Sequence, residues 1–132
     1  MNTLILCTAL LILGTKALDC LTTLRAVLVP EAESNPIARS VMNRLGVRRT
    51  VALVFVVAAT WTCALTAAAL ATESLPVGVV FVAAGLFVAL VQGAVAHSNW
   101  SGRRNRITRQ VFRFHGAPGR LTVRLRGRRA YR

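Results

Sequence analysis

The sequence predicts an all-α membrane protein with three transmembrane helices, a short interfacial helix and a basic C-terminal tail. Three apolar runs carry this prediction, at residues 3–29, 50–71 and 76–96. Each run matches or exceeds the roughly 20 residues that a helix needs to cross about 30 Å of hydrocarbon. Hydrophobic residues make up 55% of the chain, and little apolar sequence remains elsewhere for a soluble core. We therefore expect a membrane domain at residues 1–100 and an arginine-rich tail at residues 101–132.

The first run spans 27 residues, which gives a helix of about 40 Å at 1.5 Å per residue. Such a helix exceeds the hydrocarbon thickness and must tilt or protrude. Residues 1–6 contain no lysine or arginine, and no small-x-small site precedes a clear mature start. A cleaved signal peptide normally has a positively charged start and a small-x-small cleavage site. Because both are missing here, we expect the first run to be a true span.

The segment after the first run contains the signals of a short helix. Asn35 and Pro36 provide an N-cap followed by proline at the first helical position, and Gly46 suits the C-terminal cap. Apolar residues recur every four positions between these caps: Ile37, Val41 and Leu45. This pattern predicts an amphipathic helix at the inner membrane surface, and the alternative is an ordinary polar connecting helix.

The second and third runs both carry small residues at spacings of four. These are Ala59, Cys63 and Ala67 in the second run, and Gly85, Ala89 and Gly93 in the third. Small residues let helix backbones approach closely within lipid, and only residues 72–75 separate the two runs. We expect these stripes to pack against each other in a tight antiparallel hairpin, with Trp61 held between helices.

The orientation follows from where the arginines lie relative to the spans. The first connection contains Arg39, Arg44, Arg48 and Arg49, whereas the only charged residue of the second is Glu73. The tail on the far side of the third span is also basic. Lysine and arginine accumulate in cytoplasmic segments close to spans. We therefore expect a multi-pass protein of the cell membrane, with its N-terminus outside and its C-terminus in the cytoplasm.

The tail is strongly basic, since residues 97–132 contain eleven arginines and no acidic residue. Segments of this kind bind anionic lipid head groups, acidic proteins or nucleic acid. We favour membrane lipids with anionic head groups, together with a protein partner or a homo-oligomer, over nucleic acid. The arginines that we expect at this surface are Arg103, Arg104, Arg106, Arg109, Arg113, Arg120, Arg124, Arg126, Arg128 and Arg129.

The tail also contains a strand-like alternation of Leu121, Val123 and Leu125 with polar residues. Residues 107–114 are rich in β-branched and aromatic residues, and residues 115–119 have strong turn chemistry. These patterns predict a two-stranded β-hairpin. Disorder with local structure is the alternative, because an isolated hairpin is marginal in water.

The polar residues at the inner end of the first run, together with two that follow it, form the candidate intramembrane polar cluster. Its members are Lys16, Asp19, Thr22, Thr23, Glu33 and Asn35. A carboxylate within a span is costly and usually faces protein or a water-filled cavity. One hypothesis is an ion or proton site at Asp19 with threonine hydroxyls. The other, which we favour, is an Asp19–Lys16 pair near the interface that holds helices together or fixes orientation.

Catalytic and metal-binding motifs are absent from the sequence. There is no GxSxG, HExxH or phosphate-binding glycine loop, and the cysteines Cys7, Cys20 and Cys63 form no CxxC pair. We therefore expect no enzymatic activity, no cofactor and no metal site, and we interpret the cysteines as small side chains within the spans.

The stretch Asp19-Cys20-Leu21-Thr22-Thr23, followed by Glu33-Ser34-Asn35-Pro36, resembles an uncharacterised family of small prokaryotic multi-pass membrane proteins. That family has an Asp-x-x-Thr-Thr-like stretch followed by Glu-x-Asn-Pro. The resemblance covers roughly residues 13–71 and implies a small helical membrane domain without an established activity. The arginine tail is not part of this pattern.

Three functions remain compatible with the sequence. The first is an accessory or structural membrane protein whose basic cytoplasmic tail binds anionic lipid or an acidic partner. The second is a subunit of a small oligomeric transporter or channel that uses Asp19. The third is a membrane tether for nucleic acid.

Overall fold

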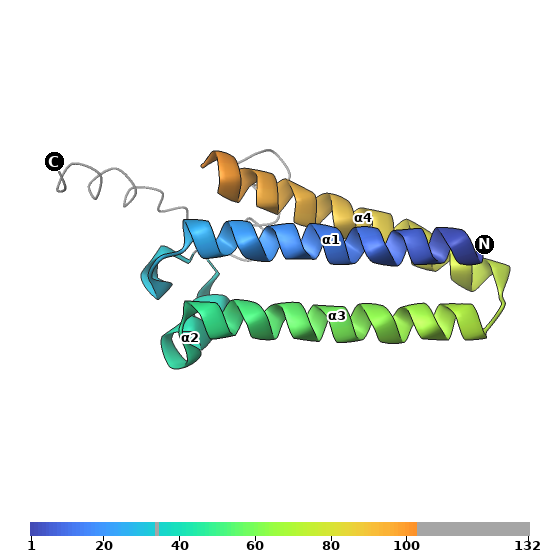
Figure 1. Cartoon of the computed structure of the whole chain (residues 1–132), viewed down its shortest axis with the longest axis horizontal. Coiled ribbons are helices and arrows are strands. Elements are labelled where there is room, and N and C mark those ends of the chain that lie inside the picture. The colour runs from blue at the N-terminus through green and yellow to red at the C-terminus, as the bar shows by residue number, and fades with distance from the viewer. Residues whose placement is uncertain (34, 103–132) are drawn as a thin grey trace, which may run out of the picture.

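The computed structural model describes residues 1–33 and 35–102, and this part of the chain contains helices and no strand. The predicted hairpin and the ten tail arginines lie outside the described residues. Figure 1 shows the long helices running along the length of the molecule, with a short helix at one end. The elements are α1 (Asn2–Ala26), the 3-10 turn η1 (Pro30–Ala32), α2 (Pro36–Leu45), α3 (Val47–Ala71) and α4 (Leu75–Ser101).

The helices α1, α3 and α4 are long and apolar enough to cross a membrane. In each of them, only 11–22% of the most apolar stretch is buried within the chain. The remaining apolar surface faces outward, as lipid requires. The three predicted spans are therefore confirmed as helices, with shifted ends. The first stops at Ala26 because Val27 is extended (φ −108°, ψ 92°), and the third continues through polar residues to Ser101.

The helix α1 is the centre of the bundle and packs along both α3 and α4. The helices α3 and α4 meet mainly where residues 72–74 join them (Figure 1). The expected packing of their small-residue stripes against each other is therefore wrong. Cys63 and Ala67 lie on the outside of α3, and Ala59 is half-buried. Trp61 is also not held between helices, because its side chain is 65% exposed within the chain.

The small-residue stripe of α4 packs against α1 instead. Gly85 and Ala89 are buried, and a Cβ placed on Gly85 would overlap Thr8 Cγ2 and lie 3.0 Å from Ile12 Cδ1. Gly93 is half-buried, and a Cβ there would meet no atom within 4 Å. Close approach of the two backbones therefore depends on Gly85 and Ala89 rather than on the whole stripe.

The helices α1 and α4 run in parallel with a repeat of seven residues. Gly78 lies against Met1, Gly85 against Thr8, and Gln92 against Thr15, and each pair is 77 residues apart in sequence. Contacts that repeat every seven residues are typical of helices crossing at a shallow left-handed angle. This register sets the depth at which each polar residue of α1 meets α4.

Threonines rather than large apolar residues fill much of the interior. Their hydroxyls donate to backbone carbonyls one turn earlier: Thr62 to Ala58 at 2.8 Å and Thr66 to Thr62 at 2.6 Å. Thr50, which is 2% exposed, donates to Gly46 at 2.9 Å. Because each hydroxyl is satisfied, these residues can be buried at helix contacts without leaving an unpaired polar group.

The helix α2 begins and ends at the predicted caps. The side-chain oxygen of Asn35 accepts from the backbone N–H groups of Ile37 (3.0 Å) and Ala38 (3.5 Å), and Gly46 at the other end has φ +81°. Met42, only 3% exposed, anchors the helix in an apolar cluster with Cys20, Val27 and Val51. The two ends of the predicted apolar stripe are exposed, Ile37 at 72% and Leu45 at 43%, whereas Val41 between them is half-buried.

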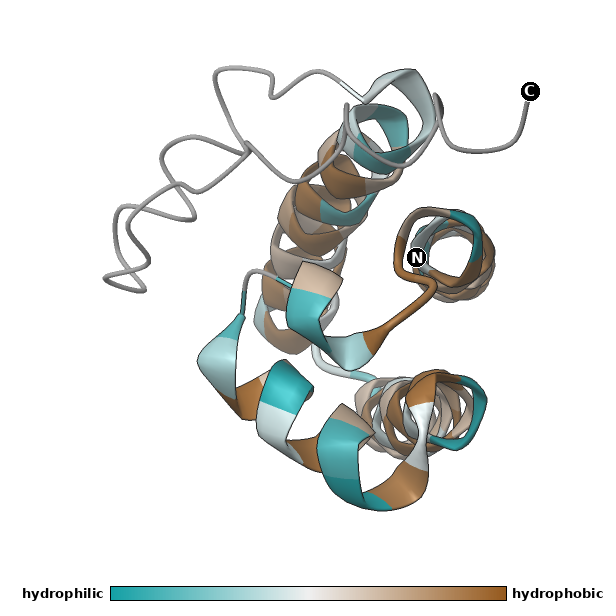
Figure 2. Cartoon of the chain, turned by 90° about the vertical axis from the view of Figure 1, so that its left-hand side faces the viewer, coloured by the Kyte–Doolittle hydropathy of each residue, from teal (hydrophilic) through white to brown (hydrophobic). Residues whose placement is uncertain are grey.

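The arginines of the described chain gather at one end of the bundle, which we call the basic end. They come from the last turn of α1, from α2 and from the first turn of α3: Arg25, Arg39, Arg44, Arg48 and Arg49. The helix α4 finishes at the same end, so the chain enters the tail there (Figures 1 and 2). At the opposite end the turn between α3 and α4 carries only one charged side chain, Glu73.

Candidate functional site

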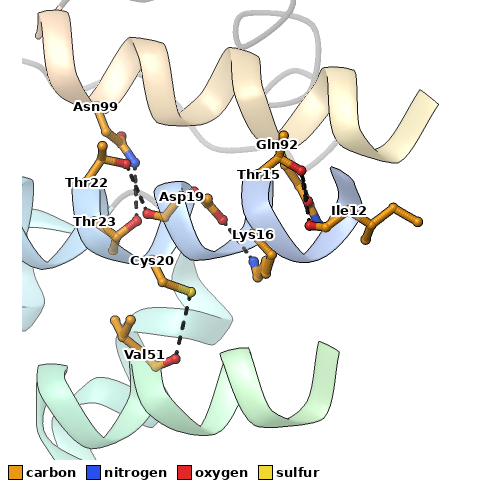
Figure 3. Close-up of polar contacts among 10 residues, drawn as sticks. All are labelled: Ile12, Thr15, Lys16, Asp19, Cys20, Thr22, Thr23, Val51, Gln92 and Asn99. Atoms are coloured by element: carbon orange, nitrogen blue, oxygen red, sulfur yellow. Dashed lines mark hydrogen bonds and ion pairs between the residues drawn. The ribbon is translucent and has the colours of Figure 1, made fainter. Parts of the chain in front are cut away.

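The candidate site is a row of polar side chains on the half of α1 nearer the basic end. We call it the polar row; its members on α1 are Thr15, Lys16, Asp19, Thr22 and Thr23 (Figure 3). The helix α1 presents these residues because spacings of three, four and seven place side chains on neighbouring faces of a helix. Two side chains of α4, Gln92 and Asn99, meet the row.

Lys16 and Asp19 form an ion pair within α1. Lys16 Nζ lies 2.8 Å from Asp19 Oδ2, and the two side chains are only 16% and 15% exposed. The expected pair is therefore present, and it lies within one helix. An unpaired charge at this depth would be costly, and a paired neighbour removes much of that cost.

Two hydrogen bonds join the polar row to α4. The hydroxyl of Thr15 donates to Gln92 Oε1 at 2.8 Å, and Asn99 Nδ2 donates to the hydroxyl of Thr23 at 3.2 Å. Sequence reasoning did not select Gln92 or Asn99 as site residues. They follow Gly78 and Gly85 at steps of seven, just as Thr15 follows Thr8. Matching the two repeats pairs Gln92 with Thr15, whereas Asn99 bonds Thr23, one residue beyond the Thr22 that the repeat would give.

We expect Thr15 and Gln92 to be energetically coupled. A double-mutant cycle with Thr15→Ala and Gln92→Leu should give a coupling of about 0.6 to 1.7 kcal/mol, the range for polar pairs between membrane helices. The measurement is the free energy of unfolding in mixed micelles. As a control, Gln92→Leu combined with Cys63→Ala should be additive, because Cys63 lies on the outer face of α3. Additivity of Thr15→Ala with Gln92→Leu would contradict the contact.

The polar row meets α3 on its other side. Cys20, beside Asp19 in sequence, places its Sγ 4.0 Å from the carbonyl oxygen of Val51, which is a weak contact (Figure 3). Thr22 donates its hydroxyl to the backbone oxygen of Asp19 at 3.0 Å, not to the carboxylate. The Asp19 carboxylate therefore has Lys16 as its partner, and in the described residues no threonine hydroxyl donates to it.

Glu33 and Asn35 belong to a different group. Asn35 donates its backbone N–H to Glu33 Oε1 at 2.8 Å, and Arg39 Nε donates to the backbone oxygen of Glu33 at 2.9 Å. These contacts organise the start of α2, and none of those described reaches Asp19. Within residues 1–33 and 35–102, no three His, Cys, Asp or Glu side chains are close enough to hold a metal ion.

An aromatic contact lies at the basic end of the same helix pair. The guanidinium of Arg25 sits 4.6 Å from the ring centroid of Trp100, one residue after Asn99. Such stacking is attractive and leaves the N–H groups at the edge of the guanidinium free to bind acceptors. The end of α1 is thus fastened to the last turn of α4, just before the tail begins.

The chemistry available to the polar row is limited. Its one carboxylate is neutralised within its own helix, and α3 and α4 contain no acidic residue. A relay of protons across the membrane uses a series of ionisable groups. The arrangement therefore suits the joining of helices better than the movement of ions.

Comparison of the chain with protein-family models, curated proteins and solved structures finds no match. The resemblance of residues 13–71 to a family of small membrane proteins stays a prediction. The function is therefore argued from the arrangement of the chain's own residues.

Proposed function

We propose that this chain is an accessory or structural membrane protein that holds a basic cytoplasmic end and tail against anionic lipid head groups or an acidic partner. One observation carries the proposal: the bundle gathers its five described arginines at the end where α4 passes into the tail. The tail adds arginines and no acid. Glu31 and Glu33 lie at the same end but are outnumbered by the arginines, so we expect this end and the tail to be basic together.

The charge at this end is large enough to hold the tail at a membrane. Each arginine close to an anionic surface contributes about 1 kcal/mol, so a handful of the tail arginines suffices. The exposed apolar stripe of α2, with Ile37 and Leu45, lies at the same end. We place α2 in the interface, where its apolar face enters the boundary between head groups and acyl chains.

The cytoplasmic assignment of the basic end rests on the positive-inside rule. It puts the N-terminus and the α3–α4 turn outside the cell and both basic segments inside. A reporter fused after Arg132 should be active in the cytoplasm. Activity only outside the cell would overturn this orientation.

The Lys16–Asp19 pair supports an anchor over a transporter or channel subunit. A transport site built on Asp19 would need its carboxylate to bind and release an ion, whereas Asp19 is held at 2.8 Å by a lysine one turn away. We assign the pair to assembly of the membrane domain.

We expect the tail to leave the membrane when its charge is removed. In lipid nanodiscs containing phosphatidylglycerol, a donor fluorophore at the C-terminus should transfer energy to a head-group acceptor. Transfer should fall when the ten tail arginines listed above become glutamine, and it should fall as salt is raised, because screening weakens exposed charge pairs. The matched control replaces the same arginines with lysine, which keeps the charge and should keep most of the transfer.

Equal energy transfer from the arginine and glutamine forms would contradict adhesion to lipid. Co-purification of the two full-length forms from cells then tests the acidic partner, which should be lost with the glutamine form. A competition between RNA and anionic vesicles addresses the nucleic-acid tether. Preference for RNA would replace the lipid proposal.

A further inference from the structure

A hollow opens at the basic end between the last turn of α1 and the first turn of α3. Its volume is about 460 Å³, within the range of about 300–1,000 Å³ that is usual for small-ligand sites. It is lined by two arginines and four aliphatic residues: Leu24, Arg25, Val27, Leu28, Val47 and Arg48.

Arg25 of α1 and Arg48 of α3 both contribute to the lining of the hollow. No acidic residue lines it, and the ion pair of Lys16 with Asp19 is the only one among the described residues. Arg25 stacks on Trp100, a contact that uses the face of its guanidinium and leaves the N–H edge available. Both arginines are exposed, and an anion placed beside them would be attracted by both charges.

The rest of the lining is aliphatic and accessible. Leu28 is 81% exposed, whereas Val27 is 8% exposed and forms the floor with the apolar cluster behind it. The hollow lies where the apolar part of α1 ends and arginines begin. An occupant that places a negative group against Arg25 and Arg48 and an alkyl chain along Leu28 is an amphiphile.

We propose that this hollow binds one anionic phospholipid of the cytoplasmic leaflet, with its phosphate between Arg25 and Arg48 and an acyl chain along Leu28. Guanidinium groups suit phosphate because they present several N–H donors in a fixed plane. The proposal rests on the orientation in the proposed function. It does not depend on the tail, because the lining residues belong to α1, to the two residues that follow it and to α3.

The test counts bound lipid on the full-length protein. Native mass spectrometry from detergent, with phosphatidylglycerol added, should show one lipid retained more strongly than phosphatidylcholine. The double variant Arg25→Gln/Arg48→Gln should weaken that lipid by about tenfold or more, given the contribution of each arginine near an anionic head group. The control is Arg49→Gln, which removes a neighbouring charge outside the hollow and should weaken binding less than the double variant does.

Two further variants keep the outcome interpretable. Arg25→Lys/Arg48→Lys retains the charge and should bind the lipid more tightly than the glutamine form, and circular dichroism should show all variants equally helical. Equal binding by the Arg25→Gln/Arg48→Gln and Arg49→Gln forms would overturn the site. Displacement of the lipid by inorganic phosphate alone would also overturn it, since the alkyl contact would then be unnecessary. The tail variant should keep this lipid, so a failure of tail adhesion is distinguishable from a failure of the hollow.

Discussion

Replacing Gly85 with valine should lower the free energy of unfolding of the membrane domain by about 2 to 3 kcal/mol. A Cβ at this position would overlap Thr8 Cγ2 and lie 3.0 Å from Ile12 Cδ1, so α4 would have to move away from α1. Thr8 cannot rotate freely out of the way, because its hydroxyl donates to the Leu4 carbonyl at 2.7 Å. The measurement is reversible unfolding in mixed micelles, followed by helical circular dichroism.

Two controls make this prediction specific to the contact. Gly93→Val on the same helix should change stability little, because a Cβ there meets no atom within 4 Å. Thr8→Ser removes the methyl group that Gly85→Ala would strike, so the pair should be more stable than Gly85→Ala alone. If Gly85→Val and Gly93→Val unfold alike, the described packing of α1 against α4 is incorrect.

The sequence predicts the elements of this fold better than their arrangement. Run length and the absence of charge suffice to locate α3 and α4, because the bilayer sets the length of a span. Asn35 and Gly46 locate the ends of α2, because caps act within one turn. The end of α1 is less predictable, since Val27 and Leu28 are apolar but already outside the helix.

The spacing of small residues along a helix does not determine which other helix packs against them. A stripe such as Gly85 and Ala89 identifies a face that permits close approach, but α1 and α3 both offer small or polar residues to receive it. Adjacency in sequence favoured α3, whereas the register of seven residues between Thr8–Thr15 and Gly85–Gln92 favours α1. A short loop keeps two helices close together only at the end that it joins. Along the rest of their length, the helix that packs against a given face is the one whose side chains fit it.

For the polar row, too, the sequence predicts contacts within one helix better than contacts between helices. Lys16 and Asp19 are three residues apart, a spacing at which helical side chains meet, so their pair followed from the sequence. Glu33 and Asn35 were grouped with Asp19 through the order of the chain. Instead, their hydrogen bonds lie at the start of α2, between Asn35 and Glu33 and between Ile37 and Asn35. Gln92 and Asn99 needed the three-dimensional register and were missed.

Single substitutions in the Lys16–Asp19 pair should lower the free energy of unfolding much more than replacement of both residues does. Asp19→Asn leaves the lysine unpaired, and Lys16→Met leaves the carboxylate unpaired, at positions where the side chains are only 16% and 15% exposed. Each single change should lower the free energy of unfolding by about 3 kcal/mol, as when one partner of a buried pair is removed. The double variant Lys16→Met/Asp19→Leu should lie within about 1 kcal/mol of the original protein or above it.

A charge swap separates assembly from transport. Lys16→Asp/Asp19→Lys restores an ion pair at the same spacing, so it should recover most of the stability that either single change loses. An ion site at the Asp19 carboxylate would not survive the swap, because the carboxylate moves to the preceding turn. Loss of ion flux in proteoliposomes with Asp19→Asn, at unchanged stability, would therefore favour the transporter. Loss of stability that the swap repairs, without any flux to lose, would identify the pair as a structural feature of α1 rather than an ion site.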